Sequence, residues 1–145
     1  FVAQEKSVGA SYYHKEDIEH AKRLLSYDTL RLPADVVVRS SRGVYACQSG
    51  EVEEDEAIED LGPTAVQGIR RACLEAKTLL WNGPLGIIEE PQTRVGSDAV
   101  AHIFAEVSRG TAYGVIGGGD TIGIPHGLGL ADLIDHVSTG GSAML

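Results

Sequence analysis

Apolar residues recur at helical spacing in three segments of the chain. The first segment predicts an amphipathic helix over about residues 15–26, after the charged stretch HKED. Its apolar positions are Ile18, Ala21, Leu24 and Leu25. A second helix is predicted to begin at Pro63 and to end near Ala76. In the third, Ser97 is the predicted N-cap, Asp98 lies in the first turn, and the buried stripe is Val100, Phe104 and Val107.

Short apolar runs typical of strands lie between these helices. They are DTLRLPADVVV, which is interrupted at Pro33, and KTLLWN, AYGVIG and LIDHVS. The stretch GVYACQ, followed by GEVEE, is predicted to form a short polar hairpin or excursion. Because strands and helices alternate, we predict an α/β fold with βαβ units and a parallel sheet that helices cover on both faces.

Three of the apolar runs end in a glycine-containing turn: TLLWNGPLG, YGVIGGGDT and DHVSTGGS. In an open parallel sheet these turns meet at the carboxyl edge of the strands, where ligands bind. Glycine lets the backbone approach a ligand closely, and a helix that follows favours an anion such as phosphate at its N-terminus. Asp120 repels phosphate unless a hard cation such as Mg²⁺ lies between them, and Thr121 can donate a hydrogen bond. The sequence therefore predicts a metal–phosphate site.

Other interpretations stay open for single features of this pattern. One glycine-rich turn before a helix is as often structural as functional, so only the combination of three turns favours a ligand. GGGDTIG departs from G-x-G-x-x-G because Ile122 stands at the third glycine, and G-x-x-x-x-G-K-[ST] does not occur. Trp81 could stack on a base, although core packing is the favoured interpretation. The histidines lack metal-ligand spacing, and there is no G-x-S-x-G elbow.

Charge and composition exclude some partners. The formal net charge is −9 with a pI of about 4.9, so nucleic acid and anionic membranes are not expected partners. The acidic run 51–60 is interpreted as a solvated loop. Cys47 and Cys73 are predicted to be reduced thiols, although one bridge stays open. No membrane span or signal peptide is predicted, and both ends suggest a piece of a longer protein.

KTLLWNGPLGIIE, VIGGGDT and LADLIDHVSTGG, in this order and spacing, closely resemble the C-terminal, nucleotide-binding domain of phosphoglycerate kinase. LPADVVV, DLGP and FVAQEKSVGASYY also resemble segments of that family, so the resemblance covers residues 1–145. It implies part of a doubly wound, three-layer αβα domain of Rossmann-like type that binds Mg-ADP or Mg-ATP. The N-terminal domain of the family holds 3-phosphoglycerate, and hinge closure brings the two domains together.

The resemblance also implies roles for individual residues. Those expected at the nucleotide are Asn82, Gly83 and Pro84 beside the transferring phosphate, Glu89 on the ribose hydroxyls, and Gly118, Gly119, Asp120 and Thr121 on the phosphates. Asp120 would bind Mg²⁺, and Gly140 and Gly141 would present N–H groups near the transferred phosphoryl group. The resemblance further implies a glycolytic enzyme of the cytoplasm or an organelle, and we expect the full-length protein to be monomeric.

The chain departs from the family at several places. The lysine-bearing GG-x-K-V segment and the N-terminal domain do not occur in it. Ile58 stands where the family usually has a glycine against the adenine ring, and Pro125 interrupts a helix that is normally alanine-rich. The sequence thus leaves two further hypotheses beside a kinase segment: a divergent, non-catalytic relative kept for binding or assembly, and an unrelated phosphate-binding α/β domain.

Overall fold

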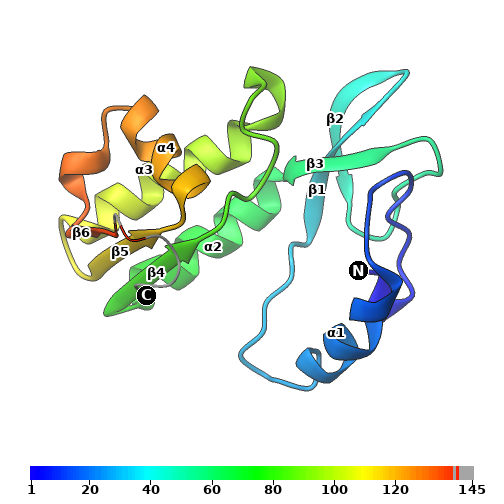
Figure 1. Ribbon diagram of the computed structural model, residues 1–145, viewed down its shortest axis with the longest axis horizontal. Helices are drawn as coiled ribbons and strands as arrows, with labels where there is room; N and C mark the ends of the chain where they lie inside the picture. Colours follow the sequence, from blue (N-terminus) through cyan, green and yellow to red (C-terminus); the bar gives the residue numbers. More distant parts are fainter. Residues whose placement is uncertain (139, 141–145) are drawn as a thin grey trace. The chain divides into compact units, whose positions relative to one another are not determined.

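The computed structural model describes residues 1–138 and 140, and the chain divides into two compact units, Phe1–Ala65 and Val66–Leu145. Figure 1 shows the elements of each unit. Among the residues that are described, no helix is both long and apolar enough to span a membrane. Both cysteines of the sequence are free.

The first unit is built on an antiparallel sheet with the strand order β2-β1-β3. Its strands are β1 (Asp35–Ser40), β2 (Gly43–Gln48) and β3 (Ala57–Leu61). They are preceded by the short 3-10 helices η1 (Val2–Gln4) and η2 (Lys15–Asp17) and by α1 (Ile18–Leu24). The helix predicted over 15–26 is therefore present as η2 and α1. None of the α1 residues is buried, and Leu24 is 55% exposed.

Of the two alternatives predicted for GVYACQ and GEVEE, a hairpin or an excursion, the hairpin between these two stretches is wrong. GVYACQ forms β2, but its partner is β1, with Ser40 opposite Gly43. Gly43 has a φ of 112°, a conformation that favours glycine, so the chain reverses immediately before β2 instead of after it. The residues of GEVEE form no strand.

Valine side chains form the hydrophobic core of the first unit. Val36, Val38 and Val52 are buried together, and Ile58 packs against them from β3, opposite Val38. Packing within this unit therefore accounts for an isoleucine at position 58. Its expected effect on adenine binding stays a prediction.

A carboxylate from β1 caps the next helix, α2 (Pro63–Glu75), which carries the chain into the second unit. The buried carboxylate of Asp35 accepts hydrogen bonds from the N–H groups of Thr64 at 2.9 Å and Ala65 at 2.7 Å. Burial, the largest single influence, raises the pKa of Asp35, but the hydrogen bonds to the carboxylate, led by those from these two N–H groups, together outweigh it and hold the pKa below its ordinary value. The Asp35 carboxylate thus acts as the anionic cap at the N-terminus of α2.

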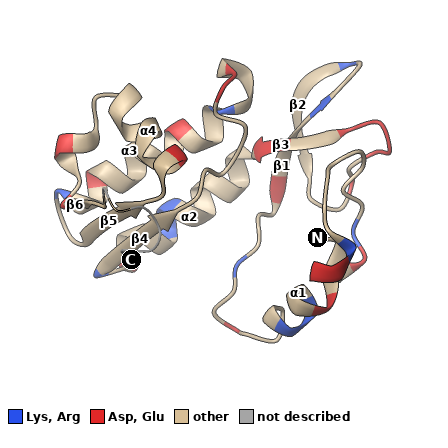
Figure 2. Cartoon of the chain, in the orientation of Figure 1, with Lys and Arg blue, Asp and Glu red and all other residues tan. Residues whose placement is uncertain are grey.

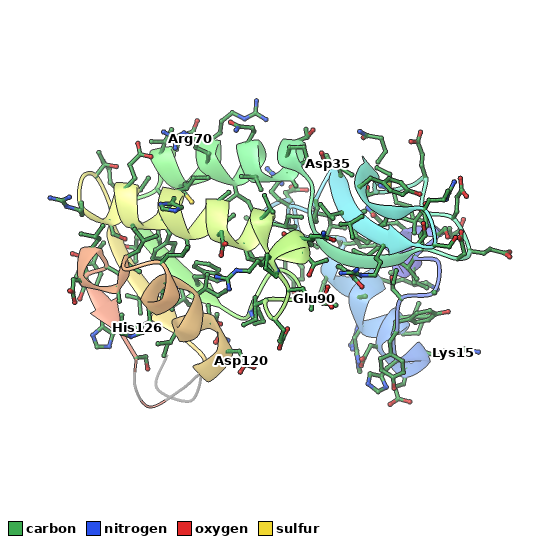
Figure 3. All side chains as sticks on the ribbon, turned by 90° about the horizontal axis from the view of Figure 1, so that it is seen from above. Lys15, Asp35, Arg70, Glu90, Asp120 and His126 are labelled. Atoms are coloured by element: carbon green, nitrogen blue, oxygen red, sulfur yellow. The ribbon has the colours of Figure 1, made fainter. Side chains whose placement is uncertain are left out.

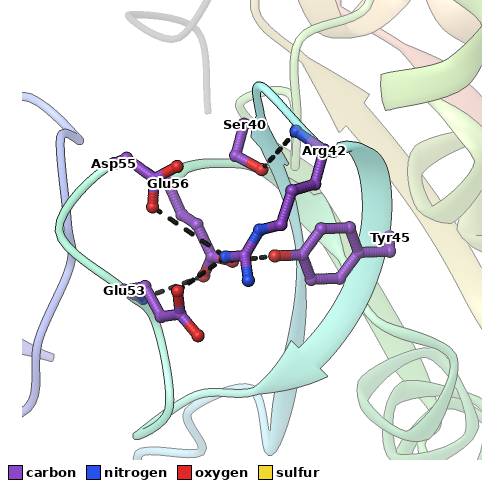
Figure 4. A network of polar contacts seen from close by, with 6 residues as sticks. All are labelled: Ser40, Arg42, Tyr45, Glu53, Asp55 and Glu56. Carbon is purple, nitrogen blue, oxygen red and sulfur yellow. Dashed lines mark hydrogen bonds and ion pairs between the residues drawn. The ribbon is translucent and has the colours of Figure 1, made fainter.

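The acidic run 51–60, red in Figure 2 on the loop before β3, is only partly a solvated loop. Glu56 is 1% exposed and Asp60 is 2% exposed, so that interpretation is wrong for both. Figure 4 shows how Glu56 is held: it accepts hydrogen bonds from the Tyr45 hydroxyl, from Arg42 Nη2 at 2.7 Å and from the Glu53 N–H at 2.8 Å. A buried carboxylate is tolerated because directed donors surround it.

The second unit contains a parallel sheet with the order β4-β5-β6, which confirms the α/β fold class. Its elements are β4 (Thr78–Asn82), η3 (Pro91–Thr93), α3 (Val95–Ser108), β5 (Tyr113–Gly117), α4 (Gly119–Gly127), η4 (Ala131–Leu133) and β6 (His136–Val137). Helices α3 and α4 pack against β5 and against each other. Leu79, Trp81 and Ile116 are buried, whereas Leu80, with the opposite side-chain direction on β4, is 62% exposed.

Helix α3 confirms its predicted stripe but not its predicted cap. Val100, Phe104 and Val107 are buried, and Asp98 lies in the first turn. Ser97 is not the N-cap, because the helix begins at Val95 with Arg94 as its N-cap, and Ser97 is fully buried inside the first turn. The ion pair of Arg94 with Asp98, at 2.8 Å, joins the residue before the helix to its first turn.

Gly114 is required by the close approach of α3 to β5. A Cβ built there would lie 1.9 Å from Ser108 Oγ and 2.9 Å from Phe104 Cε1. Gly114→Ala should therefore destabilise the protein by about 1–3 kcal/mol, because the packed helix must shift. Gly68→Ala in α2 is the control: its Cβ would meet nothing within 4 Å, and it should stabilise by about 0.5–1 kcal/mol. Guanidinium unfolding of the full-length protein measures both, and equal effects would contradict the packing.

The network around Glu56 predicts a specific loss of stability in acid. The Tyr45 hydroxyl, followed by the Glu53 N–H, holds the pKa of Glu56 below its ordinary value. Its contribution is therefore complete above the unfolded pKa of about 4.3 and disappears as the pH falls through the lower folded pKa. Glu56→Gln should be less stable than wild type at pH 7, with a difference that shrinks in acid. Glu54→Gln, on the exposed part of the same loop, should match wild type in urea unfolding at every pH.

Candidate functional site

The carboxyl edge of the β4-β5-β6 sheet collects the predicted glycine corners. Asn82 at the end of β4 pairs with Gly117 at the end of β5, so both strands stop at the same level. Beyond β6, the Ser138 N–H donates to the Ile116 carbonyl at 2.8 Å, which brings the third segment to this edge. Gly140 is exposed two residues further along, and Gly141 lies outside the described residues.

Helix α4 begins at this edge with a glycine at its N-cap. Gly118 is the N-cap with a φ of 92°, a conformation that favours glycine, and a glycine provides no side-chain oxygen to cap the helix. The first N–H groups of any α-helix lack intrahelical partners, and the helix dipole favours an anion beside them. A Cβ on Gly119 would meet nothing within 4 Å, so packing does not require glycine there.

Asp120 supplies the negative charge of this corner. Its carboxylate is exposed in the first turn of α4, and Figure 3 shows it at the end of the helix. No group of three or more His, Cys, Asp and Glu residues able to hold a metal occurs within residues 1–138 and 140. One carboxylate fits Mg²⁺ if phosphate oxygens and waters complete its coordination, which is the usual arrangement for this ion.

The corner after β4 is held by two buried side chains. The indole Nε1–H of Trp81 donates to the Gly83 carbonyl at 2.7 Å, and the Gly83 N–H donates to Thr121 Oγ1 at 2.8 Å. Trp81 is 6% exposed, with its ring 5.9 Å from that of Phe104. The interpretation of Trp81 as a core residue is confirmed, and the base-stacking alternative is wrong. Asn82 and Pro84, on either side of Gly83, are exposed.

Thr121 differs from its neighbours in α4 because it points inward. Its side chain is fully buried, whereas Gly119 and Asp120 are exposed. The hydroxyl oxygen lies beneath the corner, where it accepts from Gly83. The sequence motif places Thr121 beside the phosphates, but it carries no signal for this inward contact.

Glu89 is exposed on the loop between β4 and η3. Two residues that sequence reasoning missed hold this loop. Thr93, fully buried, donates from its hydroxyl to the Ile87 carbonyl at 2.9 Å, and Arg94 Nη1 donates to the Ile88 carbonyl at 3.4 Å. Neither residue belongs to a recognisable motif, so only the folded loop reveals the contacts.

Pro125 is accommodated inside α4. The helix continues to Gly127, and the carbonyl of the buried Pro125 accepts from the Leu130 N–H at 2.8 Å. A proline at this position lacks the N–H that would bond to the Thr121 carbonyl. The first turn of α4 is formed nevertheless, so this departure leaves the N–H groups at the edge in position.

Comparison with known proteins relates this edge to one family. A family model described as phosphoglycerate kinase matches residues 1–145. The phosphoglycerate kinase from Coxiella burnetii is similar in structure, with a TM-score of 0.88 and 31% sequence identity over 98% of this chain and 38% of that chain. The enzyme from Pyrococcus horikoshii OT3 shares the fold, with a TM-score of 0.79 and 24% identity over 99% of this chain and 38% of that chain.

The chain therefore spans 38% of the length of both solved relatives. The family match extends over all 145 residues and includes both glycine corners described above. On this evidence, the chain belongs to the phosphoglycerate kinase family.

Proposed function

We propose that this chain is the nucleotide-binding part of a phosphoglycerate kinase, which transfers a phosphoryl group between Mg-ATP and 3-phosphoglycerate. The observation that carries the proposal is the meeting of two corners at one sheet edge. Strand β4 ends at Asn82, Gly83 follows it near the start of α4 at Gly118, and the Gly83–Thr121 hydrogen bond joins the two segments. A phosphate chain fits an edge that presents backbone N–H groups.

The residues of this chain bind and orient the nucleotide in the proposed site. The N–H groups of Gly119 and Asp120 at the start of α4 face the phosphates, and the Asp120 carboxylate holds Mg²⁺. The metal, when bound, neutralises charge on the phosphate oxygens. Glu89 binds the ribose hydroxyls from its anchored loop, and Asn82 and Pro84 line the corner beside the transferring phosphate.

The acceptor is held by other parts of the protein. The family resemblance assigns 3-phosphoglycerate to an N-terminal domain and supplies cations for transfer from a lysine-bearing segment, neither of which lies within these residues. Gly140 and Gly141 contribute N–H groups near the transferred phosphoryl group. Residues 1–145 alone are therefore expected to be inactive, because each group acts only when it is positioned against both substrates. A glycolytic role in the cytoplasm, in a monomeric full-length enzyme, completes the proposal.

Asp120→Ala tests the phosphate end of the site in the full-length protein. The variant should bind Mg-ADP about 10- to 100-fold more weakly, since a charge-assisted contact contributes about 1.5–3 kcal/mol. Adenosine, which lacks phosphates, should bind both proteins equally in titration calorimetry. Asp132→Ala removes the same charge from the exposed surface of η4 and should leave both affinities unchanged.

Two outcomes would contradict the proposal. Equal Mg-ADP affinity in wild type and Asp120→Ala would remove Asp120 from the site. Absence of Mg-ADP binding by the wild-type protein would favour the non-catalytic relative that the sequence left open.

A further inference from the structure

Gly83 is fixed from both sides by side chains that lie behind the sheet edge. Its carbonyl accepts from Trp81 Nε1 at 2.7 Å, and its N–H donates to Thr121 Oγ1 at 2.8 Å. The two side chains come from different elements, the end of β4 and the first turn of α4. We call this pair of hydrogen bonds the Gly83 clamp.

The backbone at Gly83 needs such support. Its φ is 105°, although a Cβ there would meet nothing within 4 Å, so the glycine serves the conformation and not the packing. A glycine in a corner is free to adopt many conformations unless its polar groups are engaged. The clamp engages both of them and selects one.

Burial removes the Thr121 side chain from the ligand side of the edge. The side chain is 0% exposed and its oxygen already accepts the Gly83 N–H, whereas the neighbouring Asp120 is exposed. Trp81 is likewise held inward, at 6% exposure, by Phe104 of α3. Both side chains can affect a ligand only through Gly83.

We propose that Thr121 and Trp81 are positioning residues that act through the Gly83 clamp, which sets the backbone of Asn82–Pro84 against the first turn of α4. The Thr121 side chain accordingly supports the corner and is not itself a phosphate ligand. That the clamp increases the affinity for nucleotide rests on the proposed function. The clamp itself is present in the ligand-free protein. Holding the corner in advance reduces the ordering that a bound phosphate chain must impose.

The test compares three substitutions in the full-length protein. Thr121→Val keeps the shape of the side chain but loses the acceptor, and Thr121→Ser keeps the acceptor. Trp81→Phe keeps a ring against Phe104 but loses the donor to the Gly83 carbonyl. The measurements are hydrogen exchange of the peptide covering residues 82–86 without ligand, and calorimetric affinity for Mg-ADP and for adenosine.

Thr121→Val should speed exchange in residues 82–86 roughly tenfold and weaken Mg-ADP by a similar factor, because a buried donor loses its partner. Thr121→Ser should restore both to near the wild-type values. Adenosine affinity should not change, which separates a displaced corner from general loss of structure. If Thr121→Val does not fold, Trp81→Phe must show faster exchange at the same peptide for the proposal to stand.

Weaker Mg-ADP binding by Thr121→Val with unchanged exchange would overturn the proposal, since it would make Thr121 a direct ligand. Unchanged exchange in both Thr121→Val and Trp81→Phe would overturn the clamp itself. If the wild-type protein binds no Mg-ADP, the proposed function is wrong, and so is the proposed effect of the clamp on nucleotide affinity. The exchange measurement then still decides whether the clamp exists.

Discussion

Parallel pairing of β4 with β5 determines where the two glycine corners that follow these strands lie. Asn82 stands opposite Gly117, so both strands end at the same level of the sheet and their glycine-containing turns begin side by side. A slip of one residue would turn Trp81 out of the core and expose its ring, which makes this register costly to change. The corners therefore stay together because apolar side chains behind them are buried, and not because glycines prefer that edge.

The N–H groups at the N-termini of two helices in this chain differ in where their anionic partner comes from. At the start of α2, the buried Asp35 carboxylate accepts from Thr64 and Ala65, so the anion is internal. At the start of α4, the N-cap Gly118 provides no side chain, and we propose that the N–H groups there bind an anion from outside the chain. Directed donors compensate buried charge in the first unit, as they do at Glu56, and the same kind of donors make the edge of the second unit a candidate phosphate site.

The sequence predicted the elements of this chain better than their contacts. Periodic apolar residues located α3 and its buried stripe, and glycine turns located the sheet edge, because both signals are local. The residue type of Ser97 favours an N-cap, but only Arg94 separates η3 from α3, so the helix already begins at Val95. The inward direction of Thr121 and the burial of Glu56 depend on partners distant in sequence, at Gly83 and Tyr45, which no local pattern encodes.

Trp81 is the single tryptophan of this sequence, and its indole nitrogen is bonded directly to the corner that we assign to nucleotide. Indole emission depends on hydrogen bonding and on the polarity around the ring. Any ligand or substitution that moves the Gly83 carbonyl alters that bond without opening the core in which the ring lies. The chain thus carries an intrinsic optical reporter of its own sheet edge, sensitive to a backbone shift that changes no exposed side chain.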